Sequence, residues 1–208
     1  MSKKLDTVTW IFLITTIIFA GHLSVFAASP AQRDMEAKIA EAVALFRSGE
    51  VQKAVAHFRN IGDPAVPAAL ELLQSDVGSR GLPQLLLSGF IASTDGARAD
   101  AALIELLSNG SPYVRGFAAA SVGKRKLKAS VPKLIGLLRD KDVYLTTHIT
   151  HPYGYDREPS SADISTLVRD AAIDALELVE GRPLARNQSR HRQAEAWLRW
   201  WQKRNRRK

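Results

Sequence analysis

The residues of this chain that could do chemistry gather in one stretch, 141–162. It contains two histidines three positions apart, with an aspartate and three tyrosines nearby: His148, His151, Asp156, Tyr144, Tyr153 and Tyr155. Imidazole and carboxylate groups are zinc ligands, but a zinc site needs three or four of them in fixed geometry. Metal binding, or a metal-dependent enzyme, through His148, His151 and Asp156 is therefore an alternative hypothesis. The leading interpretation is a solvated segment whose tyrosines pack on the rest of the protein.

The rest of the sequence holds no pattern that predicts a reaction. There is no cysteine, which excludes disulfides, thiolate metal sites and cysteine nucleophiles. Glycine-rich phosphate loops, Gly-x-Ser-x-Gly elbows and His-Glu-x-x-His motifs are also missing from the sequence. We therefore predict that the protein is not an enzyme and needs no cofactor.

The body of the chain repeats. It has 208 residues, of which 46% are hydrophobic and 24% charged, as expected for one globular domain or a short repeat array. Leucine pairs recur at steps of 34 and 31 residues, at Leu72-Leu73, Leu106-Leu107 and Leu137-Leu138. A period of this size indicates one helix pair per step, with each pair burying its apolar face against a neighbour. The sequence therefore predicts stacked antiparallel helix pairs.

Two further segments share a turn, a Val-Arg pair and an alanine-rich helix, at 112–120 and 167–176. With the Gly-Asp-Pro-Ala-Val-Pro-Ala-Ala-Leu run at 62–70, they make residues 63–180 resemble the HEAT family and its short bacterial relatives. The resemblance implies an all-α fold, an α-solenoid wound as a right-handed superhelix. It also implies that Arg115 and Arg169 act as structural struts between repeats. The hairpin predicted at 28–62 resembles a tetratricopeptide repeat instead.

The first 27 residues read as a secretory signal. Lys3 and Lys4 precede an apolar run, and Val25 and Ala27 provide the small residues of a cleavage site after Ala27. The alternative is an uncleaved anchor in the inner membrane formed by residues 7–28. Both interpretations predict export, to the periplasm or the extracellular space.

The C-terminal segment, 181–208, carries the positive charge. The whole chain has a net charge of +8, but residues 182–208 alone have ten Lys/Arg and one acidic residue. We expect Trp197, Trp200 and Trp201 to lie on one face of a helix that caps the last repeat, with the arginines solvated. Peripheral binding of this tail to anionic membranes is an alternative, whereas export disfavours nucleic acid. The basic turn at 124–128 is also expected to be solvated.

Residues 141–162 interrupt the repeat. The step from Val114 to Val168 is 54 residues, an excess of 23 over the preceding period. Glycine and prolines favour a loop, with a short extended piece at 143–147. Insertions of this kind often carry the specificity of a repeat protein. The leading hypothesis is therefore a non-catalytic scaffold of the bacterial envelope that binds a protein of unknown identity, using Tyr144, His148, His151, Tyr153, Tyr155 and Arg157.

Overall fold

The computed structural model describes residues 29–75, 78, 80–150 and 161–206. The predicted signal segment lies outside the described residues, as do His151, Tyr153, Tyr155, Asp156 and Arg157. The chain divides into two units, residues 1–38 and 39–208. In the first, the described residues belong to the start of helix α2. The second unit contains all other described elements.

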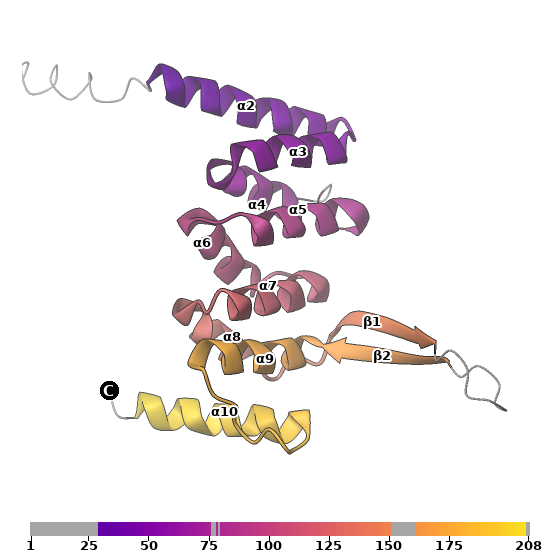
Figure 1. Cartoon of the computed structure of the whole chain (residues 1–208), viewed down its shortest axis with the longest axis vertical. Coiled ribbons are helices and arrows are strands. Elements are labelled where there is room, and N and C mark those ends of the chain that lie inside the picture. The colour runs from indigo at the N-terminus through magenta and orange to yellow at the C-terminus, as the bar shows by residue number, and fades with distance from the viewer. Residues whose placement is uncertain (1–28, 76–77, 79, 151–160, 207–208) are drawn as a thin grey trace, which may run out of the picture. The chain divides into compact units, whose positions relative to one another are not determined.

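The described part of the chain is mostly helical (Figure 1), which confirms the all-α prediction. Its nine α-helices are α2 (Pro30–Arg47), α3 (Val51–Ile61), α4 (Val66–Gln74), α5 (Gly81–Ser93), α6 (Ala97–Leu106), α7 (Pro112–Lys124), α8 (Val131–Leu137), α9 (Val168–Glu180) and α10 (Arg190–Asn205). Short 3-10 helices at Asp63–Ala65 and Lys128–Ser130 lead into α4 and α8. Two strands, β1 (Val143–Thr150) and β2 (Ser161–Leu167), form an antiparallel hairpin between α8 and α9.

The local sequence explains where several helices start. Proline occupies the first or second position of α4, α7 and α8, where its missing N–H costs nothing and its fixed φ suits a helix. The leucine pairs that set the repeat lie at the ends of α4, α6 and α8 and are buried. The leucines that reveal the repeat period in the sequence are therefore also residues of the hydrophobic core.

Helices in the second unit pack against near neighbours in the chain. The main contacts of α5 are with α3, α4, α6 and α7, and α7 in turn packs on α9. Helix α10 packs on α8 and α9. The main interhelical contacts therefore join elements one or two places apart in chain order, with alternate helices forming a row in Figure 1.

The closest interhelical packing joins α7 and α9, where small residues face each other. A Cβ placed on Gly123 would lie 2.7 Å from the Cα of Ala175. Ala118, Ala119 and Ala172 are fully buried in the same region. Small side chains let two helix backbones approach closely, as predicted from the alanine-rich sequences, and any larger residue at 123 requires the helices to separate.

The insertion is a β-hairpin, and the loop predicted for 141–162 is wrong where strands are described. The extended piece expected at 143–147 continues to Thr150 and pairs with 161–167, with Thr147 opposite Ile164 and a register irregularity between Val143 and Leu145. Helix α9 begins directly after β2, at Val168. The glycine and prolines that favoured a loop all fall within 151–160, so the alternating Thr and β-branched residues on both sides decide the structure.

Candidate functional site

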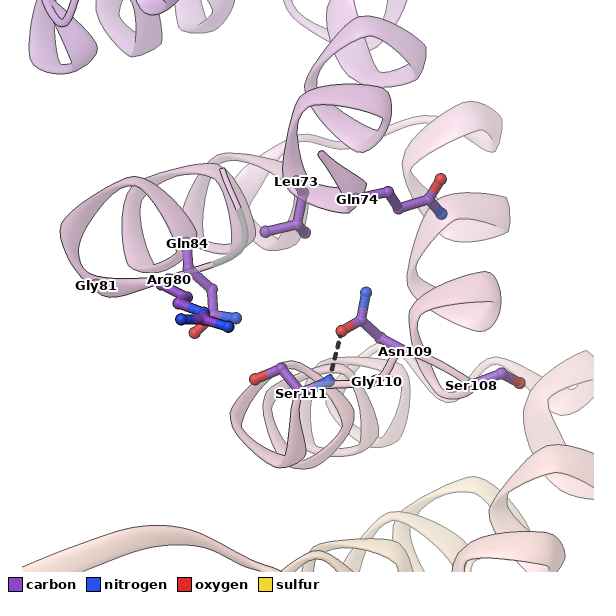
Figure 2. A pocket seen from close by; sticks show the side chains of 9 residues that line it. All are labelled: Leu73, Gln74, Arg80, Gly81, Gln84, Ser108, Asn109, Gly110 and Ser111. Carbon is purple, nitrogen blue, oxygen red and sulfur yellow. Dashed lines mark hydrogen bonds between the residues drawn. The ribbon is translucent and has the colours of Figure 1, made fainter. Parts of the chain in front are cut away.

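A groove of about 780 Å³ opens where α4 ends, α5 begins and the 108–111 turn enters α7 (Figure 2). Its lining residues come from two consecutive helix-turn units: Leu73, Gln74, Arg80, Gly81, Gln84, Ser108, Asn109, Gly110 and Ser111. Most of their side chains are uncharged and polar, and Arg80 is the one charged residue among them. The sequence reasoning missed this groove. The 34-residue step could have indicated it, because it places Gln74 and Ser108 at equivalent positions.

Hydrogen bonds organise both sides of the groove. The Asn109 Oδ1 accepts from the Ser111 N–H at 2.9 Å and holds the turn before α7. The Gln74 Nε2 donates to the Glu105 Oε1 at 2.8 Å and ties α4 to α6. Amide and hydroxyl groups can bind a ligand by donating and accepting hydrogen bonds. None of the nine described residues that line it is a carboxylate or an imidazole, so this part of the lining offers binding groups but no general base or acid.

The base of the β-hairpin is anchored by Tyr144. A Cβ placed on Gly116 of α7 would lie 2.2 Å from the Tyr144 Cγ, so the aromatic ring occupies the space that a side chain at 116 would need. Burial, and then the nearby charges of Asp174 and Asp170 on α9, raise the pKa of the Tyr144 phenol. Tyr144, predicted as a partner-binding residue, is therefore half-buried and fixes the hairpin to α7 and α9.

One face of the hairpin exposes apolar side chains. In the antiparallel register, Leu145 and Thr147 of β1 share a face with Ile164 and Thr166 of β2. Leu145 is 46% exposed and Ile164 is 51% exposed, and Val143 at the start of β1 is also open to solvent. Within the described residues, β1 and β2 form a sheet of two strands, so each has an edge that no third strand covers.

Arg115 joins the turn before α7 to the segment that follows α8. Its guanidinium donates to the Asp140 carboxylate at 2.8 Å, to the Asp142 carboxylate at 2.7 Å and to the carbonyls of Asn109 and Gly110 at 2.9 Å. Burial alone lowers the pKa of Arg115, but the bonds to the two carboxylates outweigh it and the net shift is upward. The side chain is only 12% exposed. Arg115 therefore links the turn before α7 to the acidic segment that follows α8.

Arg169, at the equivalent place in α9, has different surroundings. Its Nε lies 3.4 Å from the Asp170 Oδ1, and its main-chain N–H donates to the Asp140 carbonyl. Its two terminal nitrogens have no protein partner within the described part of the chain. The side chain is nevertheless only 15% exposed and lines a second pocket. Arg115 and Arg169 match in sequence but not in their hydrogen bonds.

The prediction that the basic turn at 124–128 is solvated is wrong for Arg125. Its guanidinium donates to the carbonyls of Ala92 at 2.7 Å and Thr94 at 2.5 Å, at the end of α5, and to the Asp100 carboxylate at 2.7 Å. These partners precede it by 25 to 33 positions. Arg125 therefore satisfies carbonyls that the end of α5 leaves without an intrahelical donor.

The C-terminal tryptophans pack against the hydrophobic core. Trp197 is fully buried, and the Trp200 ring meets it edge to face at a centroid distance of 5.2 Å. The guanidinium carbons of Arg182 and Arg204 lie 5.4 and 5.1 Å from the Trp200 ring centroid. Trp201 is half-buried next to Trp200, at a centroid distance of 6.2 Å. Arginine therefore contacts tryptophan here, and the tail packs at least part of its aromatic surface on the protein.

The described residues show no group of three or more histidines, cysteines and acidic residues that could hold a metal ion. His148 lies in β1, opposite Asp163 in the strand register. The other two residues of the hypothetical metal site, His151 and Asp156, fall outside the described residues.

Comparison with protein-family models, with curated proteins and with solved structures gave no match to this chain. Among the helices of the described part, none is both long and apolar enough to cross a lipid bilayer.

Proposed function

We propose that this protein is a non-catalytic, protein-binding scaffold of the bacterial envelope, exported by its N-terminal segment. From α3 to α10, each helix packs mainly on helices that are one or two places away in the chain. This pattern of contacts supports an α-solenoid built from HEAT-like helix pairs. The groove of Figure 2 supports a binding role, because its lining residues offer amides and hydroxyls without a catalytic acid or base.

The observation that carries this proposal is the β-hairpin. A two-stranded hairpin is marginally stable in water unless it packs on other elements or gains another strand. Tyr144 fixes its base to α7, whereas Leu145 and Ile164 present apolar surface to solvent. An extended segment of a partner protein would add to an unpaired strand edge through main-chain hydrogen bonds and cover these side chains.

Site-specific crosslinking tests the proposal. A photoreactive amino acid at Thr147, which is exposed between Leu145 and Ile164, should give one discrete protein adduct in cells that express the chain at its native level. The adduct should disappear when Leu145→Asp is combined with the photoreactive residue.

The matched control places the same photoreactive residue at Glu71, an exposed position of α4. Adducts of the same size and yield from both positions, or no adduct from Thr147, would show that the hairpin is not a partner-binding element. Circular dichroism of the Leu145→Asp variant checks that its helical content is unchanged.

A further inference from the structure

A second pocket, of about 440 Å³, lies among the end of α8, the start of α9 and one face of α10. Four of its lining side chains are basic or can become so: Arg139, Lys141, Arg169 and His191. Its floor includes Leu138 and Ala194, which are buried. The pocket therefore combines an apolar floor with a rim of positive charge.

Among the described residues, the partners of Arg169 use only part of its hydrogen-bonding capacity. At the equivalent position, Arg115 donates to two carboxylates and two carbonyls. Arg169 is almost as buried, but in the part of the chain that the structure describes its side chain has a single, long contact, from its Nε to Asp170. A largely buried guanidinium with two unused terminal nitrogens has unmet hydrogen-bonding capacity that an external anion can satisfy.

The nearby carboxylates leave a positive balance. Asp140 and Asp142 are both engaged by Arg115. Glu195, the one acidic residue that lines the pocket, lies 3.4 Å from the His191 Nε2 and 3.8 Å from an Arg199 nitrogen. With Asp170 beside Arg169 also counted, Arg139, Lys141 and Arg169 face two carboxylates among the described residues, and the balance stays positive.

From this geometry we infer that the pocket binds the phosphate group of an organic ligand. The guanidinium of Arg169 can bind two phosphate oxygens at once, while Arg139 and Lys141 add charge at the rim. The apolar floor suits the organic part of a phosphate ester. The main-chain N–H groups of Val168 and Arg169 already donate to the carbonyls of Asp142 and Asp140, so these two groups do not bind the phosphate.

Titration calorimetry of the full chain at fixed ionic strength tests this site. Phenyl phosphate should bind once per chain and more tightly than inorganic phosphate, because only the ester reaches the apolar floor. Arg169→Ala should weaken binding of phenyl phosphate by about tenfold or more, and Arg169→Lys by less, since a lysine retains the charge but loses the bidentate geometry. Lys141→Ala, on the exposed rim, should weaken binding without affecting the helix packing.

The charge-matched control is Lys124→Ala, an exposed residue at the end of α7 that does not line the pocket. Absence of saturable binding at millimolar probe, or equal effects of Lys124→Ala and Arg169→Ala, would overturn the inference. A thermal unfolding curve for each variant separates loss of the site from loss of the fold. Vesicles containing phosphatidic acid distinguish the source: Arg169-dependent vesicle binding identifies a lipid headgroup, whereas binding of phenyl phosphate alone identifies a soluble ester.

Discussion

Removing the Arg115 side chain should destabilise the protein through Asp140 rather than through Asp142. Both carboxylates accept hydrogen bonds from Arg115, at 2.8 and 2.7 Å. The Asp140 side chain is 14% exposed, whereas that of Asp142 is 60% exposed. Water can replace the lost donor at Asp142 but only in part at Asp140, so the two interactions differ in energy although their distances are alike.

The expected magnitude follows from these exposures. A hydrogen bond to a charged and largely buried group contributes about 1.5–3 kcal/mol, and a solvent-exposed ion pair contributes about 0–1 kcal/mol. With the two carbonyls at 109 and 110 also losing a donor, Arg115→Ala should lower the free energy of unfolding by about 2–4 kcal/mol. For a chain of this size that corresponds to a fall in Tm of roughly 5–15 °C.

Urea denaturation followed by circular dichroism measures these changes, and a double-mutant cycle isolates each pair. The coupling between Arg115 and Asp140 should be about 1–2 kcal/mol, and that between Arg115 and Asp142 below about 0.5 kcal/mol. Arg139→Ala, next to Asp140 but exposed, is the matched control and should change stability by less than about 0.5 kcal/mol. Equal coupling to both aspartates, or a loss below about 1 kcal/mol for Arg115→Ala, would refute the argument that burial decides the energy.

Three further predictions concern the hairpin and a helix cap. Gly116→Ala places a Cβ 2.2 Å from the Tyr144 ring and should release the hairpin from α7. Hydrogen exchange would show this release as lost protection of the β1 amides. The control is Gly136→Ala, whose new Cβ meets open space and should leave exchange in β1 unchanged. Because burial and the carboxylates of α9 raise the pKa of Tyr144 above its ordinary 10.0, its contribution to stability is complete below that value and is lost as the pH rises through the folded-state pKa. Between about pH 9 and 12, the free energy of unfolding should therefore fall more steeply with pH for the native chain than for Tyr144→Phe. Identical slopes for the two proteins would contradict this. Asp63→Ala removes the carboxylate that accepts the Ala99 N–H at 3.0 Å, and should cost about 0.5–2 kcal/mol in denaturant titrations; no loss would mean that water replaces the cap.

The helices of the body were predictable because their signals are local. A proline at a helix start and a leucine pair at a helix end each lie within the helix that they mark or next to it. The hairpin was predicted only as an extended piece at 143–147, since a strand pair also requires its partner at 161–167, and that partner follows a segment rich in loop-forming residues. Pairing between segments that are distant in sequence leaves a weak local signal.

The candidate sites were even harder to predict from the sequence, because they too depend on contacts between distant segments. The groove lining was not predicted, because Gln74 and Asn109 are ordinary polar residues until two helix-turn units bring them together. The sequence predicted a solvated Arg125, because its partners Ala92 and Asp100 are distant in the chain. They become its neighbours only when α5, α6 and α7 pack together.

The sequence by itself determined an all-α body, its repeat period and the positions of its buried leucines, because helix periodicity and capping depend on residues within one or two turns. The tertiary structure decided which arginines are satisfied. Arg115 and Arg169 both follow a valine at the start of an alanine-rich helix, yet Arg115 meets Asp140 and Asp142 while Arg169 faces a pocket. Their difference arises from the elements that pack beside each motif, since the hydrogen bonds of a long side chain depend on which distant groups the fold brings within 3 Å or so.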